Sequence, residues 1–255
     1  MNKNGKRTIA IHQPDFFPWL GFFDKMAQAD CYIVFDHVQA PQGKSWLTRN
    51  RIRLGNEARW FTLPVKRSGK TRIADLSISS DHTLLRKHLG TLRQAYQKAP
   101  FFEEIYAFVQ SLYASIPEKV ADFNFNAIKR ISEALGLKPE FVFSSNMEQE
   151  GVVLQGLGGN ELVLELCRQV GAERYISGTG CLDFIEPWTF AAEGIEFWFQ
   201  DFKHPKYKQV TSEEFISHLS ILDVLFNVGF SGAAQLISQH DLIEPERLLK
   251  PPESR

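Results

Sequence analysis

A short apolar segment, a proline-rich loop, a helical pattern and a second apolar segment follow one another near the start of this 255-residue chain, and they restrict its fold more than any other feature. Residues 8–11 and 31–35 have the composition of buried strands, and residues 19–29 between them have that of a helix. A strand, a crossover helix and a second strand form a βαβ unit with parallel strands. The loops after such strands lie at the carboxyl edge of the sheet, where α/β proteins bind ligands.

The same alternation returns in the second half of the chain. Residues 141–143, 174–177 and 195–199 are further predicted strands, with helical patterns between them. We therefore predict an α/β fold, a Rossmann-like three-layer domain with about five mainly parallel strands. A single domain is expected to span residues 1–250, followed by a frayed tail at residues 251–255.

Two regions depart from this alternation. Residues 46–78 combine short alternating segments with glycine-containing turns, which predicts an antiparallel β insertion added to the central sheet. Residues 81–136 form a helical section, in which apolar residues recur at helical spacing. Helices are expected to begin at polar capping residues. These capping positions are Asp81, residues 115–118, residues 211–214 and residues 220–223, with the last helix ending at Gly229.

The composition excludes several classes of protein. Lys and Arg number 29 and Asp and Glu number 30, so the net charge of -1 argues against indiscriminate binding to nucleic acid. Three scattered cysteines are too few for a disulfide framework and indicate free thiols. No segment approaches the ~20 apolar residues of a membrane helix, and the first residues lack the apolar core of a signal peptide. We expect a cytoplasmic protein without a membrane span.

Polar side chains suited to catalysis follow the first two predicted strands. His12, Gln13 and Asp15 come directly after the first strand, and Asp36 and Gln39 come after the second. Imidazole and carboxylate groups act as general bases, so we predict His12, Asp15 and Asp36 as catalytic residues. The alternative is a rigid, packed corner in which His12 only forms a hydrogen bond. The histidine spacings fit no metal-binding motif, so no metal ligand is predicted.

Basic residues gather between positions 44 and 72. Nine Lys and Arg stand there against one acid, Glu57, and two tryptophans are interleaved with them. Arginine combined with aromatic rings suits a phosphate-bearing ligand such as a nucleotide-linked sugar. The alternative is a solvent-exposed hairpin whose arginines pair with acids elsewhere. From this segment we predict Trp46, Arg49, Asn50, Arg51 and Lys66 as substrate-binding residues.

Later strand ends add hydroxyl groups and glycines. Glycines let a backbone approach a ligand closely, and successive N–H groups can bind an anion, whereas a plain turn is the alternative. One parallel sheet would bring all of these strand ends to the same edge. The predicted substrate-binding set is completed by Ser144, Ser177, Gly178 and Gly180 at these strand ends, and by Gln13, Trp19 and Gln39 nearer the N-terminus.

Six blocks of the sequence carry a family resemblance: residues 12–23, 36–39, 46–52, 96–102, 175–180 and 219–225. Together they resemble the WbqC-like protein family, and the first block is the most specific. The resemblance covers nearly the whole chain. It implies a protein of bacterial O-antigen (lipopolysaccharide) and other surface-polysaccharide biosynthesis. It also implies a role in transferring glycine to a sugar amine, and it supplies no catalytic residues.

A weaker resemblance concerns the start of the chain. The order of strand, aromatic and proline-rich loop, helix and strand is similar to that of pantothenate-synthetase-type ligases and nucleotidyltransferases. Those enzymes carry a His-x-Gly-His motif at the first helix, activate a carboxylate as an acyl-adenylate and pass it to an amine. Residues 17–20, Phe-Pro-Trp-Leu, stand here where the histidines would be. ATP is a candidate cofactor on this resemblance alone, and the cofactor is otherwise unassigned.

These observations together predict a transferase that attaches an aminoacyl group, such as glycine, or an acyl group to the amine of a nucleotide-linked sugar. The basic segment would bind the diphosphate, and His12 or Asp15 would take a proton from the amine. One alternative is a non-catalytic nucleotide-sugar-binding or scaffold protein of the same pathway, with a homodimer interface built from aromatic side chains. Another is an ATP-dependent acyl-adenylate ligase or nucleotidyltransferase. A tRNA is a further candidate partner, as the donor of glycine.

Overall fold

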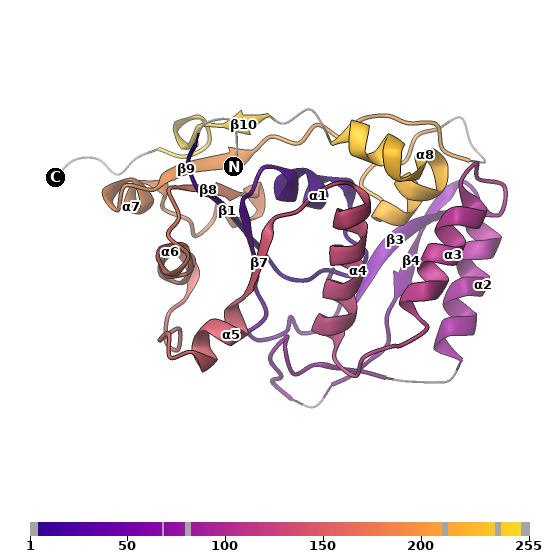
Figure 1. Ribbon diagram of the computed structural model, residues 1–255, viewed down its shortest axis with the longest axis horizontal. Coiled ribbons are helices and arrows are strands. Elements are labelled where there is room, and N and C mark those ends of the chain that lie inside the picture. Colours follow the sequence, from indigo (N-terminus) through magenta and orange to yellow (C-terminus); the bar gives the residue numbers. More distant parts are fainter. Residues whose placement is uncertain (1–4, 68, 80–82, 211–213, 238–240, 251–255) are drawn as a thin grey trace.

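The computed structural model describes residues 5–67, 69–79, 83–210, 214–237 and 241–250. A central sheet (Figure 1) is built from β1 (Thr8–His12), β2 (Cys31–Val34), β7 (Glu140–Phe143), β8 (Arg174–Ser177), β9 (Glu196–Gln200) and β10 (Leu242–Ile243). The strand order is β10-β9-β8-β1-β2-β7. All neighbouring strands in this sheet are parallel except β10, which pairs antiparallel with β9.

The direction in which strands are added to the sheet reverses at β1. From β1 the chain runs to β2 and β7 on one side, and it later adds β8 and β9 on the other. The predicted α/β fold with a mainly parallel sheet is therefore confirmed. The sequence does not predict β10, because Leu242 and Ile243 are too short an apolar run to indicate a strand. Parallel sheets of this kind bind ligands at the carboxyl ends of the strands beside the reversal, here β1 and β8.

The described part of the chain forms eight α-helices and two short helices, and some of them bury the central strands. The helices are α1 (Leu20–Ala27), α2 (Leu84–Tyr96), α3 (Phe102–Leu112), α4 (Val120–Ala134), α5 (Ser144–Gln149), α6 (Gly159–Gln169), α7 (Pro187–Ala192) and α8 (Ile221–Leu236), with the short helices η1 (Thr179–Cys181) and η2 (Pro245–Arg247). Ile9 and Cys31 join one hydrophobic cluster with residues of α6 and α7. Ala10 and Tyr32 join a second cluster with residues of α1, α4 and α8. Successive residues of these strands thus pack into different clusters, as expected of strands that are buried on both faces. Within the described ranges, no helix is long and apolar enough to cross a membrane.

The β insertion forms two small sheets that are separate from the central one. Its strands are β3 (Arg49–Leu54) paired with β4 (Glu57–Thr62), and β5 (Val65–Lys66) paired with β6 (Ser77–Ile78). The predicted antiparallel pairing is confirmed, but the prediction that the insertion extends the central sheet is wrong. The preceding strand, β2, already has β1 and β7 as its two neighbours and offers no free edge. Instead, buried Ile52 and Phe61 of the β3–β4 hairpin pack in one hydrophobic cluster with residues of α2 and α3. Figure 1 shows the hairpin beside these two helices.

One predicted helix start is wrong, and one predicted helix is absent where the described residues resume at position 214. α4 begins at Val120 instead of at residues 115–118, because Glu118 is bound to β6: its carbonyl accepts from the Ile78 N–H and its carboxylate accepts from the Ser77 hydroxyl. Residues 214–219 are not helical. There the Gln209 amide accepts from the Ile216 N–H and donates to the Ile216 carbonyl. This is the pair of hydrogen bonds that a neighbouring strand would make.

The predicted start of the last helix is confirmed. The Ser220 hydroxyl accepts the Leu222 N–H at 3.3 Å and caps α8. The predicted end at Gly229 is a kink with φ of 69°, after which α8 continues to Leu236. The predictions for Asp81, for residues 211–213 and for the tail at 251–255 lie outside the described residues.

Candidate functional site

A cavity of about 390 Å³ lies at the carboxyl end of β1, beside the reversal of the sheet. Its volume falls in the lower part of the range of small-molecule sites. Parts of the chain far apart in sequence build it: the loop after β1, the segment leading into β3, β3 itself and the segment before α8. Six of the predicted site residues meet there. The lining residues are His12, Asp15, Pro18, Trp19, Trp46, Asn50, Arg51 and His218.

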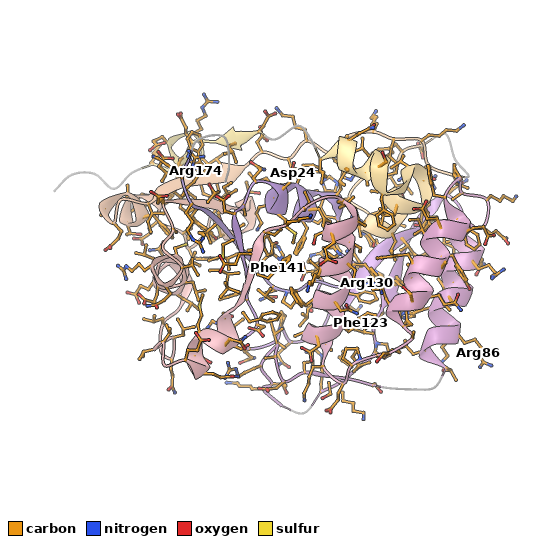
Figure 2. All side chains as sticks on the ribbon, viewed as in Figure 1. Asp24, Arg86, Phe123, Arg130, Phe141 and Arg174 are labelled. Carbon is orange, nitrogen blue, oxygen red and sulfur yellow. The ribbon has the colours of Figure 1, made fainter. Side chains whose placement is uncertain are left out.

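The loop at residues 13–19 is held in place by side-chain amides and a hydroxyl that bind its carbonyl groups. Asn124 Nδ2 donates to the Pro14 carbonyl at 2.7 Å, and Asn50 Nδ2 and Ser220 Oγ both donate to the Phe17 carbonyl at 2.8 Å. Phe17 has a positive φ of 41°, which is unusual for a residue with a side chain. Phe123 of α4, labelled in Figure 2, packs against its ring. Strained backbone held by its surroundings is common at functional sites.

His12 and Asp15 lie beside each other on the cavity wall. His12 Nδ1 is 3.7 Å from Asp15 Oδ2 and 2.9 Å from the Gln13 carbonyl oxygen. Nδ1 therefore carries the hydrogen and donates it to Gln13, which leaves Nε2 as the proton acceptor. Burial and the positive charge of Lys25 lower the pKa of His12, so its ring is neutral near pH 7. Burial raises the pKa of Asp15 to about 7, while Lys25 opposes that rise.

Lys25 is a buried lysine beneath this pair that the sequence analysis missed. Lys25 is 4% exposed, and its Nζ donates to the Ile11 carbonyl at 3.1 Å. Burial lowers its pKa to about 8, while Cys181 and Asp15 favour its charged form. Lys25 lies in the last turn of α1 among buried residues that include Phe22. A lysine in the buried stripe of a helix is the signal that identifies it in the sequence.

Trp19 forms a flat wall of the cavity. Its ring is stacked on His218, with the ring centroids 5.0 Å apart and the planes at 25°. His218 has a positive φ of 57°, and its carbonyl accepts from Arg51 Nη2 at 3.2 Å. No sequence signal identifies His218, because its place on the wall depends on contacts between distant segments.

Two arginines and two tryptophans lie together at the mouth of the cavity. The Arg49 Cζ is 3.7 Å from the centroid of Trp60, and the Arg51 Cζ is 6.0 Å from that of Trp46. The two tryptophan rings are 5.5 Å apart. Arginine over an aromatic ring keeps its planar donors available to phosphate oxygens. The mouth of the cavity is thus positively charged and lined with flat rings.

Asp36 and Ser144 lie at the ends of β2 and β7, and neither lines this cavity. The Asp36 N–H donates to Ser144 Oγ at 3.0 Å, and the Asp36 carboxylate accepts from the Ser145 N–H at 2.9 Å and from its hydroxyl at 2.7 Å. These bonds join the loop after β2 to the first turn of α5. These partners of Asp36 do not include His12 or Asp15. Its catalytic role therefore stays a prediction.

The remaining predicted residues also lie outside the cavity. Ser177 Oγ is 2.7 Å from Cys181 Sγ at the end of β8, and both groups lie within 3.2 Å of the Gly178 carbonyl. Gly180 lies in η1, which follows β8 along the chain. Gln39 lines a second cavity of about 730 Å³ with His37 and Arg72. Lys66 is exposed in β5, and Gln13 is half-buried next to His12.

The basic residues between positions 44 and 72 do not form one patch. Arg53 donates to Gln209, Arg59 pairs with Glu57, and Arg72 pairs with Glu148. Only the arginines at positions 49 and 51 of this segment accompany the tryptophans at the cavity mouth. Within the part of the chain that the structure describes, no group of three or more His, Cys, Asp or Glu side chains is placed to hold a metal ion.

Comparison with known proteins gives matches over most of the chain. The sequence model of the WbqC-like protein family matches residues 13–235. The chain is 29% identical to the uncharacterized protein Rv1507c of Mycobacterium tuberculosis over 226 residues, which cover 88% of this chain and 94% of that protein. No solved structure matches the chain at a significant level.

Proposed function

Because the chain belongs to the WbqC-like protein family, we propose that it is a transferase of bacterial surface-polysaccharide biosynthesis that acts on the amine of a nucleotide-linked sugar. The family is linked to surface-polysaccharide biosynthesis. The group transferred is an aminoacyl or acyl group, and glycine is the aminoacyl group that the family resemblance favours.

One observation carries this proposal: one cavity joins a proton acceptor to an arginine and to flat rings. His12 and Asp15 supply the proton acceptor, and Arg51 supplies a positive charge for phosphate oxygens. Trp19 and Trp46 supply flat walls for a sugar ring or a base. An amino sugar linked to a nucleoside diphosphate contains a matching group for each of these.

The proposed reaction exchanges an ester bond for an amide bond. The sugar amine attacks the carbonyl carbon of an activated aminoacyl or acyl ester, and the nitrogen loses a proton to the Asp15 carboxylate. The ester oxygen then leaves with the electron pair of the broken bond and receives that proton from Asp15. A pKa of about 7 suits Asp15 to both steps near neutral pH. Neutral His12, with Nε2 as an acceptor, orients the amine.

Calorimetry with UDP- and dTDP-linked amino sugars tests the binding step. Mass spectrometry of mixtures with glycyl-tRNA or other aminoacyl or acyl esters as donors tests the transfer step. We expect Asp15→Asn to bind the nucleotide-linked sugar and to lose transfer by roughly 10²–10⁴-fold, the usual contribution of general base catalysis. The matched control is Asp183→Asn, since Asp183 is exposed and does not line the cavity.

Two results would count against the proposal. Absence of binding by every nucleotide-linked sugar to the folded protein would exclude this substrate class. Binding without transfer from any donor, together with normal pathway product in cells that carry Asp15→Asn, would favour the non-catalytic binding or scaffold protein.

A further inference from the structure

From the outer face of the β3–β4 hairpin, we propose that the nucleobase of the nucleotide-linked sugar stacks on Trp60, outside the cavity, while the sugar enters toward His12 and Asp15. This inference rests on the proposed function and adds to it the direction in which the ligand lies.

Trp60 is a large aromatic ring that is not buried. It is 48% exposed, whereas most rings of this size pack largely into the interior. The Arg49 guanidinium lies 3.7 Å from its centroid, and Trp46 meets it at an interplanar angle of 47°. These two contacts hold the ring while leaving about half of it open. A positioned, open aromatic ring is a stacking platform for a base.

The platform is continuous with the cavity. Trp60 stands directly opposite Arg51 in the register of the hairpin, so the two side chains share one face of it. Arg51 lines the cavity and Trp60 does not. Trp46 lines the cavity as well and is 47% exposed, so it lies at the boundary between the interior and the surface. A ligand that extends from the cavity to Trp60 therefore passes the Arg51 guanidinium.

The two arginines keep donors available along this path. Among the described residues, no hydrogen bond or ion pair engages the Arg49 guanidinium, and the Arg51 guanidinium makes one bond, to the His218 carbonyl. The Nε atoms of both arginines are buried without a partner in the same ranges. Guanidinium groups that keep donors available beside a cavity suit the oxygens of a diphosphate, which joins the base to the sugar.

The size of the cavity indicates which end of the ligand lies inside it. A volume of about 390 Å³ is near the lower limit for small-molecule sites, so we expect the cavity to enclose only part of a ligand made of a base, a diphosphate and a sugar. The part inside has to be the one that carries the reacting amine, because His12 and Asp15 are inside. The base is then the part that remains outside. A neutral oligosaccharide also stacks on tryptophan, but it carries no negative charge to match the two arginines.

Three ligands test binding of the base, of the sugar phosphate and of an uncharged sugar separately: UDP, glucosamine 1-phosphate and a neutral oligosaccharide. Calorimetry is performed on the full chain and on Trp60→Ala, with Trp188→Ala as the matched control, since Trp188 lies in α7 beside a different groove. We expect Trp60→Ala to weaken UDP by roughly five- to a hundredfold, the effect of losing one base–aromatic stack, and to leave glucosamine 1-phosphate unchanged. Trp188→Ala should change neither affinity.

The outcomes distinguish this inference from the function on which it rests. Unchanged UDP affinity in folded Trp60→Ala would overturn the base site. So would a loss of oligosaccharide or glucosamine 1-phosphate affinity in its place, which would make Trp60 a sugar platform. Binding of glucosamine 1-phosphate without binding of UDP would overturn the base site and leave the proposed function standing. Failure of UDP, glucosamine 1-phosphate and the intact nucleotide-linked sugars to bind would remove the proposed function itself.

Discussion

Trp19 occupies its position because Gly21 has no side chain. A Cβ atom added at Gly21 would lie 2.4 Å from the Trp19 ring, far inside van der Waals contact. The indole thus lies across the first turn of α1, with His218 stacked on it at the cavity. A single missing methyl group sets the shape of one wall of the site.

Gly21→Ala is therefore expected to displace Trp19. The overlap should cost about 1–3 kcal/mol of stability and weaken binding of nucleotide-linked sugars, because one flat wall moves. Urea unfolding and calorimetry measure the two effects. Gly90→Ala is the matched control: Gly90 lies in α2 with nothing within 4 Å of an added Cβ, so alanine should stabilise by about 0.5–1 kcal/mol. Equal behaviour of the two variants would contradict this account of Trp19.

Burial raises the pKa of Asp15, and the positive charge of Lys25 opposes that rise. Asp15 accepts a proton only as a carboxylate, so the transfer rate should rise as the pH increases through its pKa of about 7. The Lys25 cation lowers that pKa, and its removal in Lys25→Met should move the rise to higher pH by on the order of one unit. The dependence of kcat/KM on pH measures the shift. Lys25→Arg keeps the charge and should restore the wild-type profile, whereas a wild-type profile in Lys25→Met would show that Lys25 does not act on Asp15.

A neutral, buried histidine of α2 is hydrogen-bonded to β4 and to Tyr113, the residue that follows α3. His88 is 6% exposed; its Nε2–H donates to the Thr62 carbonyl at 3.0 Å, and its Nδ1 accepts from the Tyr113 hydroxyl at 2.6 Å. Both ring nitrogens are thus used in the neutral form. Burial lowers the pKa of His88 from 6.5 to about 4. A protonated ring would lose the bond from Tyr113 and be buried with its charge.

This arrangement predicts how stability changes with pH. The folded-state pKa of His88 lies below the unfolded value, so its contribution is fully present above about pH 6.5 and is lost as the pH falls toward 4. The shift corresponds to about 3 kcal/mol of unfolding free energy. Urea unfolding at pH 7.5, 5.5 and 4.5 measures it. His88→Gln should be less stable at pH 7.5 and should lose less on acidification, and an equal acid loss in both proteins would assign the effect to other groups.

Over the whole molecule, the site depends on contacts between segments that are distant in sequence. Asn124 of α4 is fully buried and donates to the carbonyls of Pro14 and Leu47 at 2.7 and 2.8 Å. It thereby joins the loop after β1 to the segment that carries Trp46. Asn124 does not line the cavity. The geometry of the cavity is in this way set from a helix behind it.

Asn124→Ala tests this support. Two buried carbonyls lose their donor, which should cost about 1–3 kcal/mol of stability. Affinity for nucleotide-linked sugars should fall as well, although Asn124 is outside the cavity, because the loop and the Trp46 segment separate. Asn146→Ala, at an exposed position of α5, is the control and should affect neither quantity. Full affinity in a destabilised Asn124→Ala would show that the loop holds its shape without this bridge.

Local patterns in the sequence predict the parallel strands and the loop after β1. Residues of β1 and β2 are apolar on both faces, and that pattern depends only on burial of short extended segments. His12 and Asp15 are likewise predicted, because residues that follow a strand lie at its carboxyl end. The capping residue Ser220 is predicted as well, whereas the helix end predicted at Gly229 is a kink after which α8 continues.

Only the tertiary structure decides which strand ends meet in one cavity. Asp36, Ser144 and Ser177 lie at strand ends as His12 does, yet they do not line the cavity. Whether a residue at a strand end lines the cavity depends on which other segments of the chain pack over that strand end. His218 reaches the site through contacts between distant segments that no local pattern encodes. The sequence alone determines what can be buried and where strands end. The packing of distant segments determines which polar groups face the same space, because that choice is made by contacts between residues far apart along the chain.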